Sequence, residues 1–251
     1  MKQVFTLCII LSFSVFYGSG LYSQACTPDP LFTGEGISPD TIANMPPACV
    51  PMAYSATFTI HPPPDTVMGG FLFTINFLRI DSVTGLPLGF TYACSPANCT
   101  YPGGATGCAI VTGTPTLPQI GIYPLTIYVT IQVYNPIFGT INQPSTFDGY
   151  VLKIGGGMNI TSNSLDAGCG VSDGSAWVSV TGVVPFTYLW NTIPTSTNDT
   201  VFNVAAGNYQ VNITDNYGCI DSTLISVNNP NSPIIDSIIE VADGIMVARG
   251  D

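Results

Sequence analysis

Side chains suited to catalysis are scarce in this chain. Its one histidine, His61, falls on the polar side of an alternating segment and is followed by three prolines. A nucleophile needs a neighbouring base, yet the sequence has no Gly-x-Ser-x-Gly elbow, no His-Glu-x-x-His motif and no phosphate-binding glycine loop. We therefore expect His61 to be a surface residue and the protein to have no catalytic residues and not to be an enzyme.

Cysteines could serve as metal ligands or form disulfides. Cys94, Cys99 and Cys108 lack the CxxC spacing of zinc sites, and no histidine adjoins them. In an exported protein disulfides are the expected use, so no metal ligand and no cofactor is assigned. Calcium is left open without assigned ligands, because loop carboxylates and backbone oxygens can bind it. The pairing stays open among Cys26, Cys49, Cys94, Cys99 and Cys108.

A recurrent tripeptide offers another chemistry, the attachment of sugar to a hydroxyl group. Asp, then Ser or Thr, then an aliphatic residue or Thr, occurs at six of the thirteen aspartates, where about one would arise by chance. It resembles the O-glycosylation sequence of gliding Gram-negative bacteria. The alternative is that Asp-Ser/Thr recurs at turn-to-strand junctions. The candidate acceptors are Thr41, Thr66, Ser82, Thr200, Ser222 and Ser237.

Trp177 is the candidate for ligand contact. It shares parity with Ser179 and Thr181, opposite Ala176 and Val178, so it falls on the polar side of an alternating segment. An exposed Trp can stack on a sugar or fill a partner's pocket. The alternative is that Trp177 packs against a neighbouring domain or under a loop.

Short alternating segments predict the elements that position these residues. Residues 54–60 and 123–133 place aromatic and aliphatic side chains on one parity, as in strands with one buried face. Charged residues are only 8% of the chain, Gly and Pro number 26 and 21, and long helical periodicity is missing. We predict an all-β fold of two tandem antiparallel immunoglobulin-like β-sandwiches, stapled by disulfides.

The amino end predicts export. Lys2 and the apolar run over 4–16 are typical of a signal peptide, assigned to residues 1–25. Cleavage before Cys26 is one of several options, and lipid attachment to Cys26 is an alternative. No second apolar run is long enough to span a membrane, so the mature chain is expected to be secreted or on the outer cell surface. Nucleic acid is excluded as a partner, because only three cations then oppose fifteen carboxylates.

The mature chain divides into four expected parts. A first domain spans 26–154, a flexible glycine linker spans 155–157, a repeat unit spans 158–228, and 229–251 holds a linker and a hairpin around Asp243-Gly244. Within the repeat, Cys169 and Cys219 flank the strands and are predicted to pair and to staple its first and last parts. Val241-Ala242-Asp243-Gly244 echoes Val171-Ser172-Asp173-Gly174, so the tail is interpreted as the start of a truncated second repeat.

Two stretches carry family resemblances. Gly85-Leu86-Pro87-Leu88-Gly89-Phe90, Gly113-Thr114-Pro115-Thr116 and Gly121-Ile122-Tyr123 resemble an immunoglobulin-like family of bacterial surface proteins over 85–130. Asp173-Gly174-Ser175-Ala176, Pro185-Phe186-Thr187-Tyr188-Leu189-Trp190 and the run Ala206-Gly207-Asn208-Tyr209 to Asp215-Asn216-Tyr217-Gly218-Cys219 resemble the SprB repeat family over 158–228. The resemblance implies display modules exported by the type IX route.

The expected function is accordingly adhesion or matrix contact without catalysis, with an extracellular glycan or a surface protein as partner. One alternative is an accessory carbohydrate-binding module of a secreted polysaccharide-degrading enzyme, binding through Trp177. Another is a structural spacer without any ligand.

Overall fold

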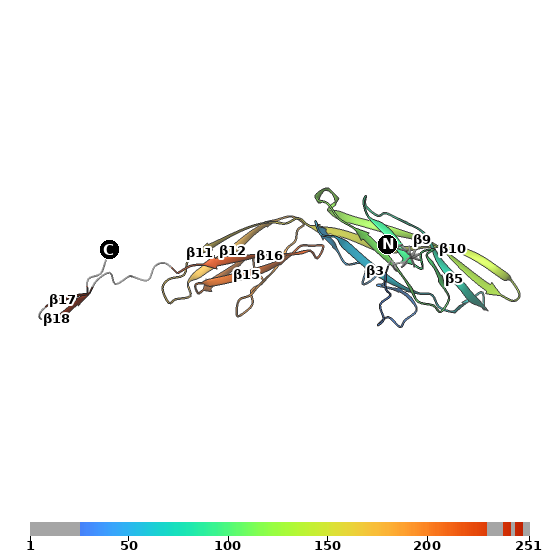
Figure 1. Cartoon of the computed structure of the whole chain (residues 1–251), viewed down its shortest axis with the longest axis horizontal. Helices are drawn as coiled ribbons and strands as arrows, with labels where there is room; N and C mark the ends of the chain where they lie inside the picture. The colour runs from blue at the N-terminus through green and yellow to red at the C-terminus, as the bar shows by residue number, and fades with distance from the viewer. Residues whose placement is uncertain (1–25, 230–237, 242–243, 248–251) are drawn as a thin grey trace, which may run out of the picture.

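The chain folds as two β-sandwiches arranged end to end (Figure 1). The structure is a computed structural model that describes residues 26–229, 238–241 and 244–247. Strands make up nearly all of its regular structure, with one short 3₁₀ helix, η1 (Leu117–Gln119). The expected all-β class, with two tandem β-sandwiches stapled by disulfides, is confirmed. The predicted signal peptide, 1–25, lies outside the described residues.

Two sheets, one of four strands and one of six, form the first sandwich. One sheet has the order β1 (Gly36–Ser38), β3 (Tyr54–His61), β8 (Gly107–Gly113) and β6 (Thr91–Ser95). The other has the order β2 (Ala48–Val50), β10 (Gly139–Gly156), β9 (Gly121–Asn135), β5 (Phe71–Thr84) and β4 (Asp65–Met68), with β7 (Thr100–Pro102) also paired to β5. The strands pair antiparallel except β2, which lies parallel to the end of β10.

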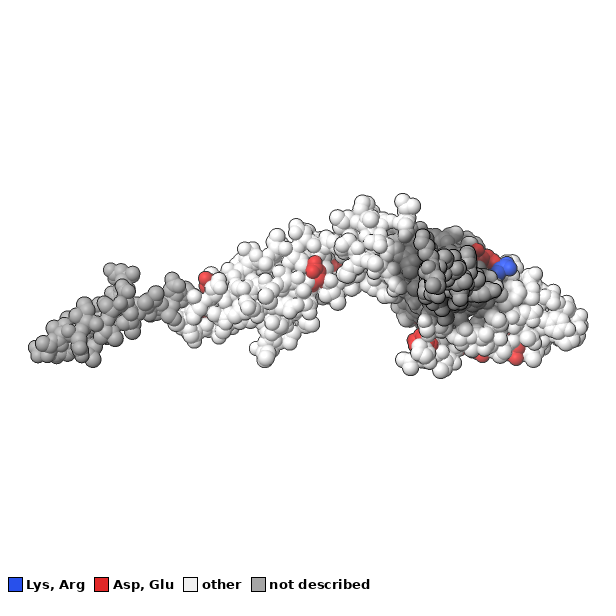
Figure 2. All heavy atoms as spheres, in the orientation of Figure 1, with Lys and Arg blue, Asp and Glu red and all other residues white. Residues whose placement is uncertain are grey.

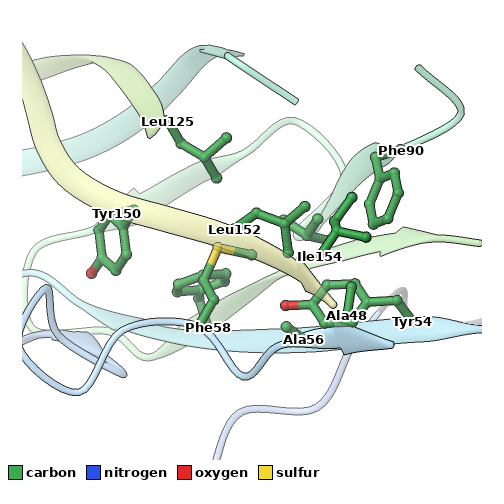
Figure 3. Packing of buried hydrophobic residues seen from close by; sticks show 11 residues of the cluster. Ala48, Tyr54, Ala56, Phe58, Phe90, Leu125, Tyr150, Leu152 and Ile154 are labelled. Atoms are coloured by element: carbon green, nitrogen blue, oxygen red, sulfur yellow. The ribbon is translucent and has the colours of Figure 1, made fainter. Parts of the chain in front are cut away.

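Period-two alternation builds the core between these sheets. In β3 the even-numbered Tyr54, Ala56 and Phe58 are buried, whereas the intervening Ser55 and Thr57 are exposed. Facing them from β10 are Leu152 and Ile154, which are fully buried, and Figure 3 shows these side chains meeting between the layers. Burial of apolar surface contributes about 25 cal/mol per Å² to the free energy of folding, and this burial holds the two sheets together.

Buried tyrosine hydroxyls make this core sensitive to alkali. The Tyr150 hydroxyl donates to the Pro39 carbonyl at 2.9 Å. Burial, and secondarily the nearby Asp40 carboxylate, raise the pKa of Tyr150 to about 12. Burial also raises the pKa values of Tyr54 and Tyr101. Each of these groups therefore holds its proton more tightly when folded than when unfolded.

We expect the contribution of these tyrosines to the free energy of unfolding to be constant up to about pH 10 and to fall from there towards pH 12. The unfolded chain loses tyrosine protons near pH 10 while the folded chain keeps them, and each such group removes up to about 1.4 kcal/mol per pH unit. Urea unfolding at pH 9 and pH 11 measures the slope. The Tyr150→Phe variant should show a shallower fall, and an equal fall in both proteins would contradict this account.

Six strands form the second, smaller sandwich. One sheet has the order β11 (Asn159–Leu165), β12 (Gly174–Thr181) and β14 (Thr200–Val204). The other has the order β13 (Thr187–Trp190), β15 (Gly207–Thr214) and β16 (Ile220–Val227). Val211 and Ile213, which share a parity in β15, and Trp190, which lies opposite Val211 in β13, are fully buried between the sheets.

Residues 155–157 do not form the expected flexible linker. Gly155 and Gly156 are buried in the last two positions of β10, where they pair with Cys49 and Val50 of β2. Gly156 has a φ of +83°, in the left-handed region that favours glycine, as the chain leaves the first sandwich. The Gly156 amide donates to Oδ2 of Asp215 at 2.7 Å. The prediction of a hinge here is wrong, because tertiary pairing and a buried carboxylate fix these glycines.

Asp215 is the centre of this junction. Asp215 is 5% exposed, and its Oδ1 accepts from the amides of Tyr217 and Cys219, each at 2.9 Å. The β15–β16 turn, residues 215–219, thus presents its carboxylate to the end of β10. One side chain satisfies three backbone donors, of which the Gly156 and Cys219 amides would otherwise be buried without partners.

Gly155→Ala should loosen the junction. A β-carbon at Gly155 would lie 2.6 Å from Asp215 Oδ2 and 3.1 Å from the Cys219 sulfur, so the turn would have to move away and the Gly156 hydrogen bond would break. We expect a loss of about 1–3 kcal/mol in the free energy of unfolding, measured by urea titration. Gly121→Ala is the control, since a β-carbon there meets nothing closer than 3.9 Å. Equal stability of the two variants would refute the close contact.

The expected carboxyl-terminal hairpin is present, with a shifted turn. β17 (Ile238–Val241) pairs antiparallel with β18 (Gly244–Val247), and Val241 lies opposite Gly244. Gly244 is therefore part of the strand instead of the turn that Asp243-Gly244 predicted. The other residues of the proposed truncated repeat, 230–237, 242–243 and 248–251, lie outside the described residues.

Few charges mark the surface. Figure 2 shows isolated acidic groups and one small basic spot on an otherwise uncharged face. One ion pair of the described residues joins Arg79 and Asp81 at 2.7 Å. None of the helical structure described is long and apolar enough to cross a membrane.

Candidate functional site

Trp177 lies on the outer face of the second sandwich. In β12 its neighbours Ala176 and Val178 point inward and are buried, so alternation directs Trp177 outward, with 36% of the residue exposed. Asn163 of β11 and Thr200 of β14 lie directly opposite it. Trp177 is therefore partly covered by its own sheet and partly open to solvent.

Two further apolar side chains extend this surface. The next row on the same side of the sheet aligns Leu165, Ser175 and Phe202. Leu165 is 60% exposed and Phe202 is 71% exposed. Diagonal neighbours on one face of a sheet are about 7–8 Å apart, within reach of aromatic side chains. We call Leu165, Trp177 and Phe202, with Asn163 and Thr200, the Trp177 face.

A hollow of about 490 Å³ adjoins the Trp177 face where β13 and β14, the edge strands of the two sheets, approach each other. Aromatic rings of Phe186, Tyr188 and Phe202 line it together with the polar residues Asn198 and Asp199. A second hollow of about 580 Å³ lies against the same loop and also includes Asn198 and Phe202. Thr200 and Phe202 thus belong both to the Trp177 face and to the hollow lined by Tyr188.

A carboxylate gives this hollow its electrostatic character. Burial, and secondarily the Asp199 carboxylate, raise the pKa of Tyr188, so its hydroxyl remains a hydrogen-bond donor throughout the physiological range. Thr200 Oγ1 donates to Asp199 Oδ1 at 2.9 Å. A carboxylate offers about four acceptor positions, so Asp199 keeps capacity for a ligand.

The buried Trp190 anchors the loop over residues 191–199 to the core. The indole Nε1 of the buried Trp190 donates to the Asn198 carbonyl at 2.7 Å, and the Trp190 amide donates to Ser196 at 3.0 Å. Thr192 Oγ1 donates to the Pro194 carbonyl and accepts from the Ser196 amide. The hollow is therefore formed by a loop fixed to the core.

Sequence reasoning found Trp177 but missed the neighbouring hollow. Tyr188 shares parity with the buried Trp190, and it is half-buried, packing against the core from an edge strand of the sandwich. In the sequence, Asp199 and Thr200 indicate only a glycosylation motif. The available signal was the aromatic pair Phe186 and Tyr188 at the end of a strand, but which loop would face them is a tertiary property.

The predicted bond between Cys169 and Cys219 is wrong. Cys219 is bonded to Cys49 of the first sandwich, with their Cα atoms 5.6 Å apart, and Cys169 lies exposed in the loop between β11 and β12. That loop meets the end of β16, since the Ala167 amide donates to the Asn228 carbonyl. Cys219 precedes the start of β16, so a strand of eight residues, about 25 Å, separates the two cysteines. A disulfide requires Cα atoms within about 7 Å.

The remaining cysteines pair within the first sandwich. Cys26 is bonded to Cys108, and Cys94 is bonded to Cys99. The Cys26 sulfur is therefore not available for the lipid attachment that the sequence left as an alternative. Cys94, Cys99 and Cys108 all lie in disulfides instead of a zinc site.

The glycosylation candidates differ in accessibility. Thr41 and Ser222 are exposed, Thr66, Ser82 and Thr200 are half-buried, and Ser237 lies outside the described residues. Asp65, Thr200 and Ile220 begin β4, β14 and β16, so three of these motifs lie at strand starts. Ser82 is instead inside β5, beside an irregularity in its pairing with β9.

Intact-mass measurement of the natively secreted protein tests the glycosylation motif. We expect hexose-type increments, with Thr41 and Ser222 modified to the greatest extent because a transferase needs an exposed hydroxyl. The Thr41→Ala/Ser222→Ala variant should lose most of the added mass. If the wild-type protein carries no added mass, the glycosylation prediction is wrong and the Asp-Ser/Thr motif recurs only because it suits turn-to-strand junctions.

His61 is half-buried at the end of β3, and its Nδ1 is 2.8 Å from Thr106 Oγ1. It does not join a cluster of acidic residues or cysteines. Over the described part of the chain, no group of three or more His, Cys, Asp or Glu side chains is arranged to hold a metal ion.

The β4–β5 and β9–β10 hairpins turn at the end of the first sandwich that lies away from the second (Figure 1). Aromatic side chains of these two hairpins pack together there. The ring of Phe138 packs edge-on against Phe71 at 5.1 Å and stacks on Phe73 at 5.9 Å. Leu72 and Ile137 beside them are 59% and 74% exposed. We call Phe71, Leu72, Ile137 and Phe138 the hairpin tip.

The sequence matches no protein-family model, and no curated protein is significantly similar to it. Among solved structures, a C-terminal 282-residue fragment of intimin in complex with the intimin-binding domain of its translocated receptor, Tir, is 14% identical with a TM-score of 0.35, over 69% of this chain and 58% of that one. This chain therefore spans just over half of the intimin fragment's length.

Two other solved structures show a similar degree of likeness. The first eight immunoglobulin domains of Down syndrome cell adhesion molecule are 15% identical with a TM-score of 0.30, over 74% of this chain and 23% of that one. Domains 3 and 4 of rat CD4 are 11% identical with a TM-score of 0.24, over 72% and 98%. Likenesses of this degree transfer neither a partner nor an activity to this chain.

Proposed function

We propose that this chain is a non-catalytic adhesion module, secreted or displayed on the cell surface, that holds contact surfaces at a fixed spacing. The observation that carries the proposal is the junction between the sandwiches. The Cys49–Cys219 bond and the Asp215 carboxylate join two domains that a flexible linker would leave independent. Tandem domains move relative to each other by default, so a bonded junction favours a role that depends on stiffness.

Exposed apolar surfaces on both sandwiches support a role in binding other molecules. The hairpin tip lies at the end of the first sandwich that is remote from the second, and the Trp177 face lies on the second (Figure 1). Exposed aromatic clusters are common where proteins bind partners, because aromatic rings bury a large area at low entropic cost. Disulfides that close both the first sandwich and the junction fit an oxidising, extracellular location.

Labelling and adhesion test the proposal together. An antibody raised against residues 26–229 should label intact, unpermeabilised cells or the culture medium. Beads coated with the mature chain should be retained under flow on a neutral polysaccharide gel or on protein-coated glass. Retention on neither surface, with clear external labelling, would favour the spacer alternative. A signal only after permeabilisation would refute the proposal.

The resemblance of residues 158–228 to SprB repeats suggests how the protein is exported. Export by the type IX system would bring the chain to the outer surface, where a stiff rod can act in adhesive or gliding contacts. Loss of the protein from the medium and surface of a strain without that system is the expected result.

The second candidate is an accessory carbohydrate-binding module. The observation that favours it is the position of Trp177 beside Phe202 and an aromatic-lined hollow. Trp177→Ala should then abolish binding to soluble glycan while leaving the fold intact. Adhesion without any glycan affinity would favour the first candidate.

A further inference from the structure

We propose that the hollow between β13 and β14, lined by Phe186, Tyr188, Asp199 and Phe202, binds an uncharged oligosaccharide that extends across the Trp177 face. This inference rests on the proposed role as an extracellular binding module and names a site and a ligand class for it. The site is distinct from Trp177 itself, which contributes only the adjoining platform.

The lining has the two kinds of groups that a pyranose ring requires. Phe202, 71% exposed, presents a flat apolar surface for the C–H face of a sugar, and Phe186 and Tyr188 also line the hollow. The Tyr188 hydroxyl, the Asp199 carboxylate and the Asn198 amide supply donors and acceptors for sugar hydroxyls. Pockets that combine aromatic walls with a few convergent polar groups are typical ligand sites.

The charge of the hollow favours uncharged sugars over acidic ones. Among the residues that the structure describes, the Lys and Arg side chains are Arg79 and Lys153, both in the first sandwich. The hollow contributes only the negative charge of Asp199, which repels the carboxylate or sulfate of an acidic sugar. An uncharged glycan meets no such repulsion, and its hydroxyls can donate to the carboxylate.

Preorganisation further favours binding at this place. Trp190, 1% exposed, fixes the Asn198 carbonyl from the core, and Thr192 ties together the loop around Pro194. The walls come from the edge strands of two different sheets that the sandwich core holds together. Ligand binding would therefore order little of the protein, which lowers the entropic cost of association.

Thr200 links this inference to the glycosylation motif. Its hydroxyl donates to Asp199 and it lines the hollow, so a sugar attached to Thr200 would occupy the site that a free glycan needs. We assign the hollow to a free glycan. A hexose increment on Thr200 in the natively secreted protein would overturn that assignment.

Calorimetry with the mature chain, its disulfides intact, tests the site. The probes are neutral cello-, xylo-, manno- and laminari-oligosaccharides, with oligogalacturonate as the acidic comparison. Phe202→Ser and Asp199→Asn should each weaken binding of the neutral ligand at least tenfold, and oligogalacturonate should not bind. Leu224→Ser is the matched control, because Leu224 is 61% exposed on the other sheet of the same sandwich.

The outcomes separate this inference from the proposed function. All three variants must unfold at the wild-type temperature, since the replaced side chains are exposed. The inference fails if none of the neutral probes binds, or if Leu224→Ser weakens binding as much as Phe202→Ser does. Bead adhesion that persists in both hollow variants would then leave the adhesion role standing, with contact at another surface such as the hairpin tip.

Discussion

Replacing Cys49 and Cys219 together by serine is expected to uncouple the two sandwiches. The bond closes a loop with a sequence separation of 170 residues, and the chain-entropy model assigns such a loop about 5 kcal/mol. Both tryptophans, Trp177 and Trp190, lie in the second sandwich, so their fluorescence reports that domain alone. Circular dichroism reports both domains. The two thermal transitions should coincide in the wild type and separate in the variant.

A second disulfide provides the control for that experiment. Cys94 and Cys99 are only five residues apart, within one sandwich, so the Cys94→Ser/Cys99→Ser variant should lose about 2 kcal/mol without separating the transitions. Small-angle scattering of Cys49→Ser/Cys219→Ser should also show a broader range of interdomain angles. If Cys49→Ser/Cys219→Ser keeps coincident transitions and wild-type scattering, Asp215 alone holds the junction.

Trp190→Ala is expected to unfold the second sandwich or nearly so. Trp190 is 1% exposed, the largest of the fully buried side chains, and truncation of such a residue costs about 3–5 kcal/mol. That loss is comparable with the whole stability of a domain of this size. The variant also removes the indole donor to the Asn198 carbonyl, so the loop over 191–199 should lose its fixed position. Urea unfolding followed by the fluorescence of Trp177 measures the effect.

Two variants make the Trp190 result specific. Trp177→Ala removes the same side chain from the same sandwich at a position 36% exposed, and should change stability by less than about 1 kcal/mol. Trp190→Phe keeps an aromatic ring but leaves the Asn198 carbonyl without its donor, and should cost about 1–2 kcal/mol. Comparable losses for Trp190→Ala and Trp177→Ala would contradict the assignment of Trp190 to the core.

The strands could be predicted because alternation is a local property. Tyr54, Ala56 and Phe58 share a parity and are buried together, and Trp177 is exposed on the opposite parity from Ala176 and Val178. The same rule places Tyr188 on the inner side of its strand, where it is half-buried and packs against the core from an edge of the sandwich. Parity fixes the side of a strand that a residue occupies, but not what covers that side.

The junction could not be predicted from local patterns. Gly155 and Gly156 have the composition of a linker, yet β2, more than a hundred residues earlier, pairs with them and Asp215 accepts from Gly156. Cys169 and Cys219 flank one repeat, which made them an attractive pair, but strands separate them. Cysteine pairing depends on which strand ends meet, and those contacts join residues far apart in the chain.

The sequence by itself determined the all-β class, the two sandwiches and the outward position of Trp177. Each of these follows from period-two patterns and turn residues within a few positions of one another. Only the tertiary structure decided that Cys49 binds Cys219, that the glycines at 155 and 156 are rigid, and that Tyr188, Asp199 and Phe202 line one hollow. The physical reason is that all three features join residues far apart in the chain: β2 and β10 pair within one sheet, and the other two features require edges of different sheets to meet. The packing of the buried cores sets which strands and edges meet.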